Sequence, residues 1–169
     1  VGLLEAVRAE RVFTSANRAL VWAEDQLLAE LLMGEENMGE IPLEQVDALA
    51  GMTPAGLRQL KKYLFRNQAS AGTRLIEQGA QPDFLLIIVR GRVQIEFASG
   101  SKETAETVST ICPGRLLGEM AFVDRQVRSA SAYAEDEVVY WRIDYTGFEE
   151  LQQESPSAAY QLMQGIASD

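Results

Sequence analysis

The chain has 169 residues, 47% of them apolar, which is enough for one domain of ordinary size with a hydrophobic core. Its net charge of −10 argues against nucleic-acid or anionic-membrane partners, because both require clustered lysine and arginine. The absence of histidine excludes histidine-based catalysis and histidine metal sites, and the single cysteine excludes an internal disulfide and a multi-cysteine zinc site.

The first 34 residues contain one strongly apolar helix pattern. Ser15 can cap a helix that runs from about Ala16 to Met33, with Gly34 as its stop. Its apolar face is too wide for a single solvated helix, so it packs on the domain that follows, belongs to a preceding domain or pairs with a second chain. The chain starts at Val1 without methionine and shows neither a signal peptide nor a run of membrane-spanning length, so we expect it to be a piece of something longer.

Residues 35–66 predict a linker and two short helices. A Gly/Glu/Asn linker over 35–40 precedes a helix from Pro42 through Leu49, and Thr53-Pro54 then provides a cap and a first-turn proline for the next helix. That helix should direct three leucines inward: Leu57, Leu60 and Leu64. Its basic residues form the only such cluster in the chain: Arg58, Lys61, Lys62 and Arg66. We interpret the cluster as a solvated face, with a docking face for an acidic partner as the alternative.

From Tyr63 to Ile143 the periodicity is that of short strands. Residues 84–89 form a continuous apolar run, as in a strand buried on both faces, whereas 93–97 alternate apolar with polar. The remaining segments are strands over 107–112 and 138–143 and a hairpin turn over 98–101. Cys112 is expected to be a small core residue. Turn glycines punctuate the region at Gly72, Gly79, Gly91, Gly114 and Gly118, so we predict a small barrel or sandwich.

The stretch from Gly118 to Ala130 combines a glycine–acid pair with an arginine. Gly118 can open a short helical turn whose backbone N–H groups approach an anion closely. Arg128 adds a fork of donors and a full charge. Glu119 would repel an anion, but it can accept a hydrogen bond from a sugar hydroxyl. Together they suggest a nucleotide whose phosphate and sugar lie close together.

Gly118-Glu119, the small Ala121 and Arg128-Ser129-Ala130 resemble the phosphate-binding cassette of the cyclic nucleotide-binding domain family. The ordered glycines resemble the family's turn positions, which extends the likeness over about residues 53–167. The resemblance implies an α+β fold: an antiparallel β-roll, which is a jelly-roll-like double-stranded β-helix, with N-terminal helices and C-terminal B and C helices.

The tail of the sequence agrees with the two C-terminal helices of that family. Asp144 can cap a helix that contains Phe148 and Leu151, and Ser155-Pro156 begins another. The second helix has one apolar face, which consists of Ala159, Leu162, Met163 and Ile166. In family members this C helix closes over the base of the nucleotide.

The resemblance also implies a ligand. Arg128 would pair with the exocyclic oxygens of a cyclic phosphate, Glu119 would accept from the ribose 2′-OH, and Leu117 would pack on sugar and base. The implied ligand-binding set is Leu117, Gly118, Glu119, Met120, Ala121, Arg128, Ser129 and Ala130, without a metal. Ser129 lies between the alanine of cAMP-selective members and the threonine of those that prefer cGMP, and we favour cAMP over cGMP.

A second resemblance concerns Val12-Phe13, Ala19-Leu20, Trp22 to Asp25 and Leu27-Leu28, which look like the closing helix of a STAS domain in SulP-type (sulfate permease family) anion transporters. It implies three parts: residues 1–34 as the end of a STAS-like domain and linker helix, 35–52 as linker and short helix, and 53–169 as the cyclic nucleotide-binding domain.

The two resemblances together imply a non-enzymatic sensor that controls an attached membrane transporter for sulfate-type anions. It would lie on the cytoplasmic side of the membrane, the fragment itself being soluble. The implied partners are a cyclic nucleotide and the attached transporter or STAS domain, without nucleic acid, and two chains can pair as a homodimer through helix 16–33. The alternatives are a ligand-blind β-roll that acts as an interaction or structural module, and the sensor domain of a transcription regulator.

Overall fold

The computed structural model describes residues 39–97 and 106–168. Gly39–Asp169 forms one compact unit of the chain and Val1–Met38 another. The predicted helix 16–33 and the predicted hairpin turn over 98–101 lie outside the described residues, and the domain limits at 34/35 and 52/53 stay predictions.

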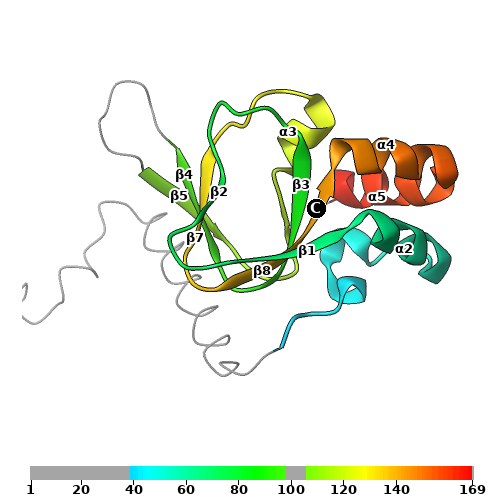
Figure 1. Cartoon of the computed structure of the whole chain (residues 1–169), viewed down its shortest axis with the longest axis horizontal. Helices are drawn as coiled ribbons and strands as arrows, with labels where there is room; N and C mark the ends of the chain where they lie inside the picture. Colours follow the sequence, from blue (N-terminus) through cyan, green and yellow to red (C-terminus); the bar gives the residue numbers. More distant parts are fainter. Residues whose placement is uncertain (1–38, 98–105, 169) are drawn as a thin grey trace, which may run out of the picture. The chain divides into compact units, whose positions relative to one another are not determined.

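In the described part of the larger unit, two four-stranded antiparallel sheets face each other (Figure 1). The first has the order β1 (Phe65–Ala69), β8 (Val138–Asp144), β3 (Phe84–Arg90) and β6 (Leu116–Leu117). The second has the order β2 (Arg74–Ile76), β7 (Ser131–Ala134), β4 (Val93–Phe97) and β5 (Glu106–Ile111). This arrangement confirms the predicted α+β fold with an antiparallel β-roll.

Strand β3 has a core on each of its faces, as the continuous apolar run predicts. Leu85, Ile87 and Val89 belong to the core shared with the helices. Leu86 and Ile88 point the other way, into the core between the two sheets. Because successive side chains of a strand alternate between faces, one seven-residue segment joins both cores.

Two expectations in the strand region are wrong in part. Val93 of β4 is fully buried and Ile95 packs against the core between the sheets, as expected for a half-buried strand, but Phe97 at the end of the strand is 45% exposed. Cys112 is half-buried rather than a core residue. It follows the last residue of β5, where the chain leaves the sheet and turns at Gly114.

The helices before the β-roll are shorter than predicted. The segment expected to be one helix from Pro42 forms two 3₁₀ turns, η3 (Leu43–Gln45) and η4 (Asp47–Leu49), because Val46 between them is extended. Helix α2 (Pro54–Leu60) begins as expected, since the N–H of Gly56 donates to the Thr53 hydroxyl at 3.0 Å. A further 3₁₀ turn, η5 (Lys61–Tyr63), leads into β1.

The predicted basic cluster is a solvated face in this structure. Lys61 pairs with Glu44 at 2.9 Å, and Arg66 of β1 forms an ion pair with Glu40. All four basic residues of the cluster are exposed, and such surface pairs contribute little to stability.

Two helices follow the β-roll, α4 (Tyr145–Glu154) and α5 (Pro156–Ser168). Asp144 stands at the N-cap position of α4, but its carboxylate makes no cap bond and accepts from Arg142 Nε at 2.6 Å, which corrects its predicted capping role. Helix α5 packs on α2, α4 and η4, which places it in the helical layer beside the sheet that contains β3 (Figure 1). No helix in the described ranges is long and apolar enough to cross a bilayer.

Candidate functional site

The candidate site is organised around the short helix α3 (Glu119–Asp124) and the glycine before it. Gly118 has φ +84°, and an added Cβ would lie 2.4 Å from Arg128 Nη1 and 3.0 Å from Ile76 Cδ1. Only glycine meets both the backbone and the space requirement here. The first N–H groups of a helix have no acceptor within that helix, so the turn after Gly118 begins with backbone donors that α3 itself does not use.

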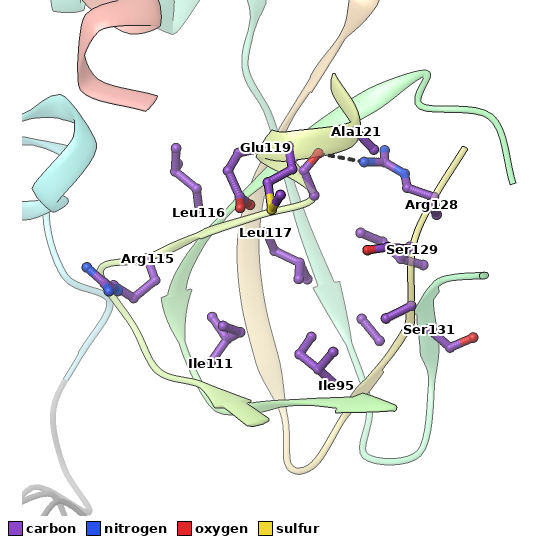
Figure 2. A pocket seen from close by; sticks show the side chains of 15 residues that line it. Ile95, Ile111, Arg115, Leu116, Leu117, Glu119, Ala121, Arg128, Ser129 and Ser131 are labelled. Atoms are coloured by element: carbon purple, nitrogen blue, oxygen red, sulfur yellow. Dashed lines mark hydrogen bonds between the residues drawn. The ribbon is translucent and has the colours of Figure 1, made fainter. Parts of the chain in front are cut away.

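Arg128 lies at the centre of the site and is only 3% exposed. Its backbone is paired with the segment before β3: its N–H donates to Ala80 O at 2.9 Å, and its carbonyl accepts from Gly79 N at 2.8 Å. Its side chain donates from Nη1 to Gly118 O at 2.7 Å, the dashed line in Figure 2, and from Nη2 to Phe84 O. Main-chain groups therefore fix both the backbone and the guanidinium of this residue.

The guanidinium of Arg128 is a buried cation with donors to spare. Burial lowers its pKa from the ordinary value, the carboxylates of Asp83 and Glu119 act in the opposite direction, and Arg142 lowers it again. A guanidinium carries five N–H donors, and two are used by the carbonyl oxygens. Among the described residues, the buried Nε has no hydrogen-bond partner. A buried donor without a partner is costly, and an oxyanion acceptor would remove that cost.

All eight residues predicted to bind a ligand line one cavity of about 300 Å³, between α3 and the strands (Figure 2). That volume is at the small end of the range for small-molecule sites. Seven further lining residues were not named from the sequence: Ile76, Ile95, Ile111, Arg115, Leu116, Ser131 and Ala132. The alternation of β4 points to Ile95, but no local pattern marks Arg115 or Ser131.

The cavity has a polar and an apolar end. Glu119 and Arg128 lie beside α3, whereas the side chains of Ile95 and Ile111 come from β4 and β5 at the opposite end (Figure 2). Ser131 lines the cavity, but its hydroxyl accepts from Gln78 N at 3.0 Å and so takes part in the fold. The shape suits a ligand with an anionic end and a flat, less polar end.

The ionisable side chains among the lining residues are Arg115, Glu119 and Arg128. Arg115 forms a long ion pair with Asp47, at 3.4 Å, and both side chains are largely exposed. Two cations and one carboxylate suit the recognition of an anion rather than nucleophilic or general acid–base chemistry. In the part of the chain that the structure describes, no group of three or more His, Cys, Asp or Glu residues is placed to hold a metal.

The β-roll, the glycine-led helix and the buried arginine define a binding module for a small anionic molecule. The chain belongs to the cyclic nucleotide-binding domain family, whose model matches residues 66–155.

Relatives of this chain include regulatory proteins and enzymes. It is 26% identical to Glutaminase 2 of Bradyrhizobium diazoefficiens over 94% of this chain and 24% of that protein. It is 25% identical to the cAMP-dependent protein kinase regulatory subunit of Aspergillus fumigatus over 88% of this chain and 36% of that protein. A cyclic nucleotide-binding domain from Methylobacillus flagellatus shares the fold at 20% identity and a TM-score of 0.67, over 75% of this chain and 74% of that one. The chain thus spans about a quarter to a third of these two curated relatives.

Proposed function

We propose that this chain is a non-catalytic sensor module that binds a cyclic nucleotide in the α3 cavity and regulates an attached protein. The observation that supports it is the buried Arg128 guanidinium, which lies at the polar end of the cavity with unused donors. A cyclic phosphate provides two exocyclic oxygens for such a group, and the first residues of α3, which also line the cavity, can donate their N–H groups to the same anion.

The proposal extends to the other predicted contacts. Glu119 accepts from the ribose 2′-OH, Leu117 and the isoleucines of β4 and β5 contact sugar and base, and Ser129 lies next to the phosphate. We propose cAMP as the preferred ligand over cGMP, on the residue type at position 129. Family membership and a cAMP-dependent regulatory subunit among the relatives support a cyclic nucleotide of either kind.

The test is calorimetric titration of the chain with cAMP and with cGMP. We expect one site, and Arg128→Leu should weaken binding by about 2–4 kcal/mol because a charge-assisted contact to the phosphate is lost. The matched control is Arg74→Leu, an exposed arginine whose ion-pair partner is Glu77, which should bind like the parent. The absence of heat and of thermal stabilisation with both nucleotides at millimolar concentration would instead favour the ligand-blind β-roll.

For the attached protein, the STAS-like pattern before Gly39 supports a membrane anion transporter regulated from the cytoplasmic side. The glutaminase match favours a second candidate, an attached enzyme. Its alignment of 158 residues is longer than the segment from Gly39 to Asp169, so it includes part of the chain before Gly39. The full-length gene distinguishes the two: a series of apolar spans upstream supports the transporter, and a glutaminase-like domain supports the enzyme. Dimerisation through helix 16–33 stays a prediction.

A further inference from the structure

Arg125, the residue that follows α3, has an unusual backbone conformation. Among the described residues it is the one non-glycine residue with positive φ, at 57°. An L-residue with a long side chain adopts this left-handed region at a cost, and other interactions must offset it. Only residues 126 and 127 separate Arg125 from Arg128, so this bend directs the chain from α3 back to the cavity.

The side chain of Arg125 has a defined partner. Its guanidinium carbon lies 3.3 Å from the centroid of the Tyr145 ring, in a cation–π contact with the first residue of α4. The same ring makes an edge contact with Phe122 of α3, with centroids 5.5 Å apart. One tyrosine therefore holds the buried side of α3 and the residue that ends it.

Tyr145 is in turn fixed to the segment that holds Arg128. The Tyr145 N–H donates to Asp83 O at 2.8 Å, and the next carbonyl, Phe84 O, accepts from Arg128 Nη2. The contacts form a closed circuit from Arg125 through Tyr145 and residues 83–84 to Arg128. The orientation of Arg128 thus depends on Arg125 both through the chain and through Tyr145.

We propose that Arg125 and Tyr145 form a clasp that positions Arg128 for ligand binding and links the cavity to α4. This inference rests on the proposed nucleotide site. Both are positioning residues: Arg125 is not among the residues that line the cavity, and neither is Tyr145. A ligand held by Arg128 stabilises the clasp, and by reciprocity the clasp raises affinity for the ligand.

The test measures nucleotide affinity of the whole chain and hydrogen exchange of α4 in matched variants. Arg125→Ala and Tyr145→Leu should each weaken binding by about 3–10-fold, the range expected from loss of a cation–π contact. Arg125→Gly should lose less, because glycine adopts positive φ without cost. Tyr145→Phe keeps the ring and should bind like the parent, as should the distant control Arg58→Ala.

Two further measurements distinguish positioning from general stability. The double variant Arg125→Ala/Tyr145→Leu should bind no more weakly than the weaker single variant, because both remove one contact. Nucleotide should slow exchange in residues 145–154 of the parent and of Tyr145→Phe, and much less in Arg125→Ala. Additive effects of the two substitutions, or parent-like affinity of Arg125→Ala, would overturn the clasp.

Failure of the proposed function is separable from failure of the clasp. If the parent binds neither nucleotide, hydrogen exchange of two amides still reports on the position of Arg128. The Gly79 N–H donates to Arg128 O and the Arg128 N–H donates to Ala80 O, so both amides exchange faster when this pairing loosens. The clasp requires faster exchange of these amides in Arg125→Ala than in the parent and in Tyr145→Phe. Equal exchange in all three would contradict it. If Tyr145→Leu does not fold, Arg125→Ala and Arg125→Gly provide the same comparison, because Arg125 is exposed and its substitution should leave the fold intact.

Discussion

At the scale of single residues, two positions make the site feasible. Gly118 has a backbone and a surrounding space that exclude a side chain, since an added Cβ would meet Arg128 Nη1. Arg128 is the one buried charged residue among those the structure describes, and it retains donors beyond its two carbonyl contacts. Glu119, half-buried at the start of α3, is the remaining charged group at this end of the cavity.

Glu119→Ala should weaken binding of the ribose-containing nucleotide by about 1–3 kcal/mol, because a hydrogen bond to a charged acceptor is lost. Binding of the 2′-deoxy analogue should hardly change, since it lacks the hydroxyl that Glu119 is proposed to accept from. Calorimetric titration of the unsubstituted protein and of Glu119→Ala, each with the nucleotide and with its 2′-deoxy analogue, gives the four affinities of a double-mutant-type cycle. Equal weakening for the two ligands would show that the carboxylate has another role.

At the scale of elements, α5 fits tightly against the segments that precede the β-roll. Helix α5 approaches η4 so closely that a Cβ on Gly165 would lie 1.7 Å from Ala48 O. Gln161 of the same helix accepts from the Thr53 N–H at 3.1 Å. Helix α5 is buried through Ala158, Ala159 and Leu162 and contributes no residue to the cavity lining, so closure of this helix over a base stays a prediction.

Gly165→Ala should destabilise the fold by about 1–3 kcal/mol, because the new methyl group meets a main-chain carbonyl that cannot turn aside as a side chain does. Gly51→Ala is the control, since nothing lies within 4 Å of a Cβ at that position. Urea unfolding monitored by tryptophan fluorescence measures both variants. A Gly165→Ala protein as stable as Gly51→Ala would show that α5 shifts without cost.

Tyr63 in η5 interacts with Glu154 of α4, and this contact should give the fold an alkaline pH dependence. Its hydrogen bond to Glu154 raises its pKa from 10.0 to about 12, with smaller effects of burial and of the nearby carboxylates. A pKa raised in the folded state favours the protonated form, so the stabilisation is complete below pH 10 and is lost as the pH rises toward 12.

The parent should therefore be more stable than Tyr63→Phe at pH 8–9, and the two stabilities should converge between pH 10 and 12. The phenylalanine variant keeps the ring and removes only the hydroxyl. Urea unfolding of both proteins at successive pH values gives the difference directly. A difference that stays constant up to pH 12 would rule out the bond to Glu154 as its source.

At the scale of the whole molecule, the unit from Gly39 has two cores on opposite faces of the β1-β8-β3-β6 sheet. One lies under the helices and the other between the sheets. Leu117, in the core between the sheets, also lines the cavity. A ligand in the cavity thus contacts residues that stabilise the fold as a whole.

A fragment of residues 39–169 should unfold in one cooperative transition and keep the parent's nucleotide affinity, because both cores and the cavity are formed by described residues of this unit. Nucleotide at 100 times its dissociation constant should add about 2.7 kcal/mol to its stability. Thermal unfolding with and without cAMP measures the cooperativity and the stabilisation, and calorimetric titration measures the affinity. Two separate transitions would show that the two cores unfold independently. Loss of binding on truncation would show that the site needs the first 38 residues.

The sequence alone determined the features that rest on local chemistry. The glycines at turns have positive φ in the structure, at Gly72, Gly79, Gly91, Gly114 and Gly118, because that conformation excludes most other residues. The residues themselves pointed to Gly118, Glu119 and Arg128, and the resemblance to the family's cassette implied the full set of eight, all of which line the cavity.

Only the tertiary structure decided the contacts between distant segments. Arg128 donates to carbonyls of Gly118 and Phe84, and no local pattern names a main-chain acceptor 44 residues away. Strand β6 has only two residues and β7 only four, too few for a periodicity to mark them in the sequence, and their pairing with β3 and β4 defines them. The place of α5 likewise follows from its close approach to Ala48. Local conformation follows from residue type, whereas partners across the fold are set by how the sheets and helices pack together.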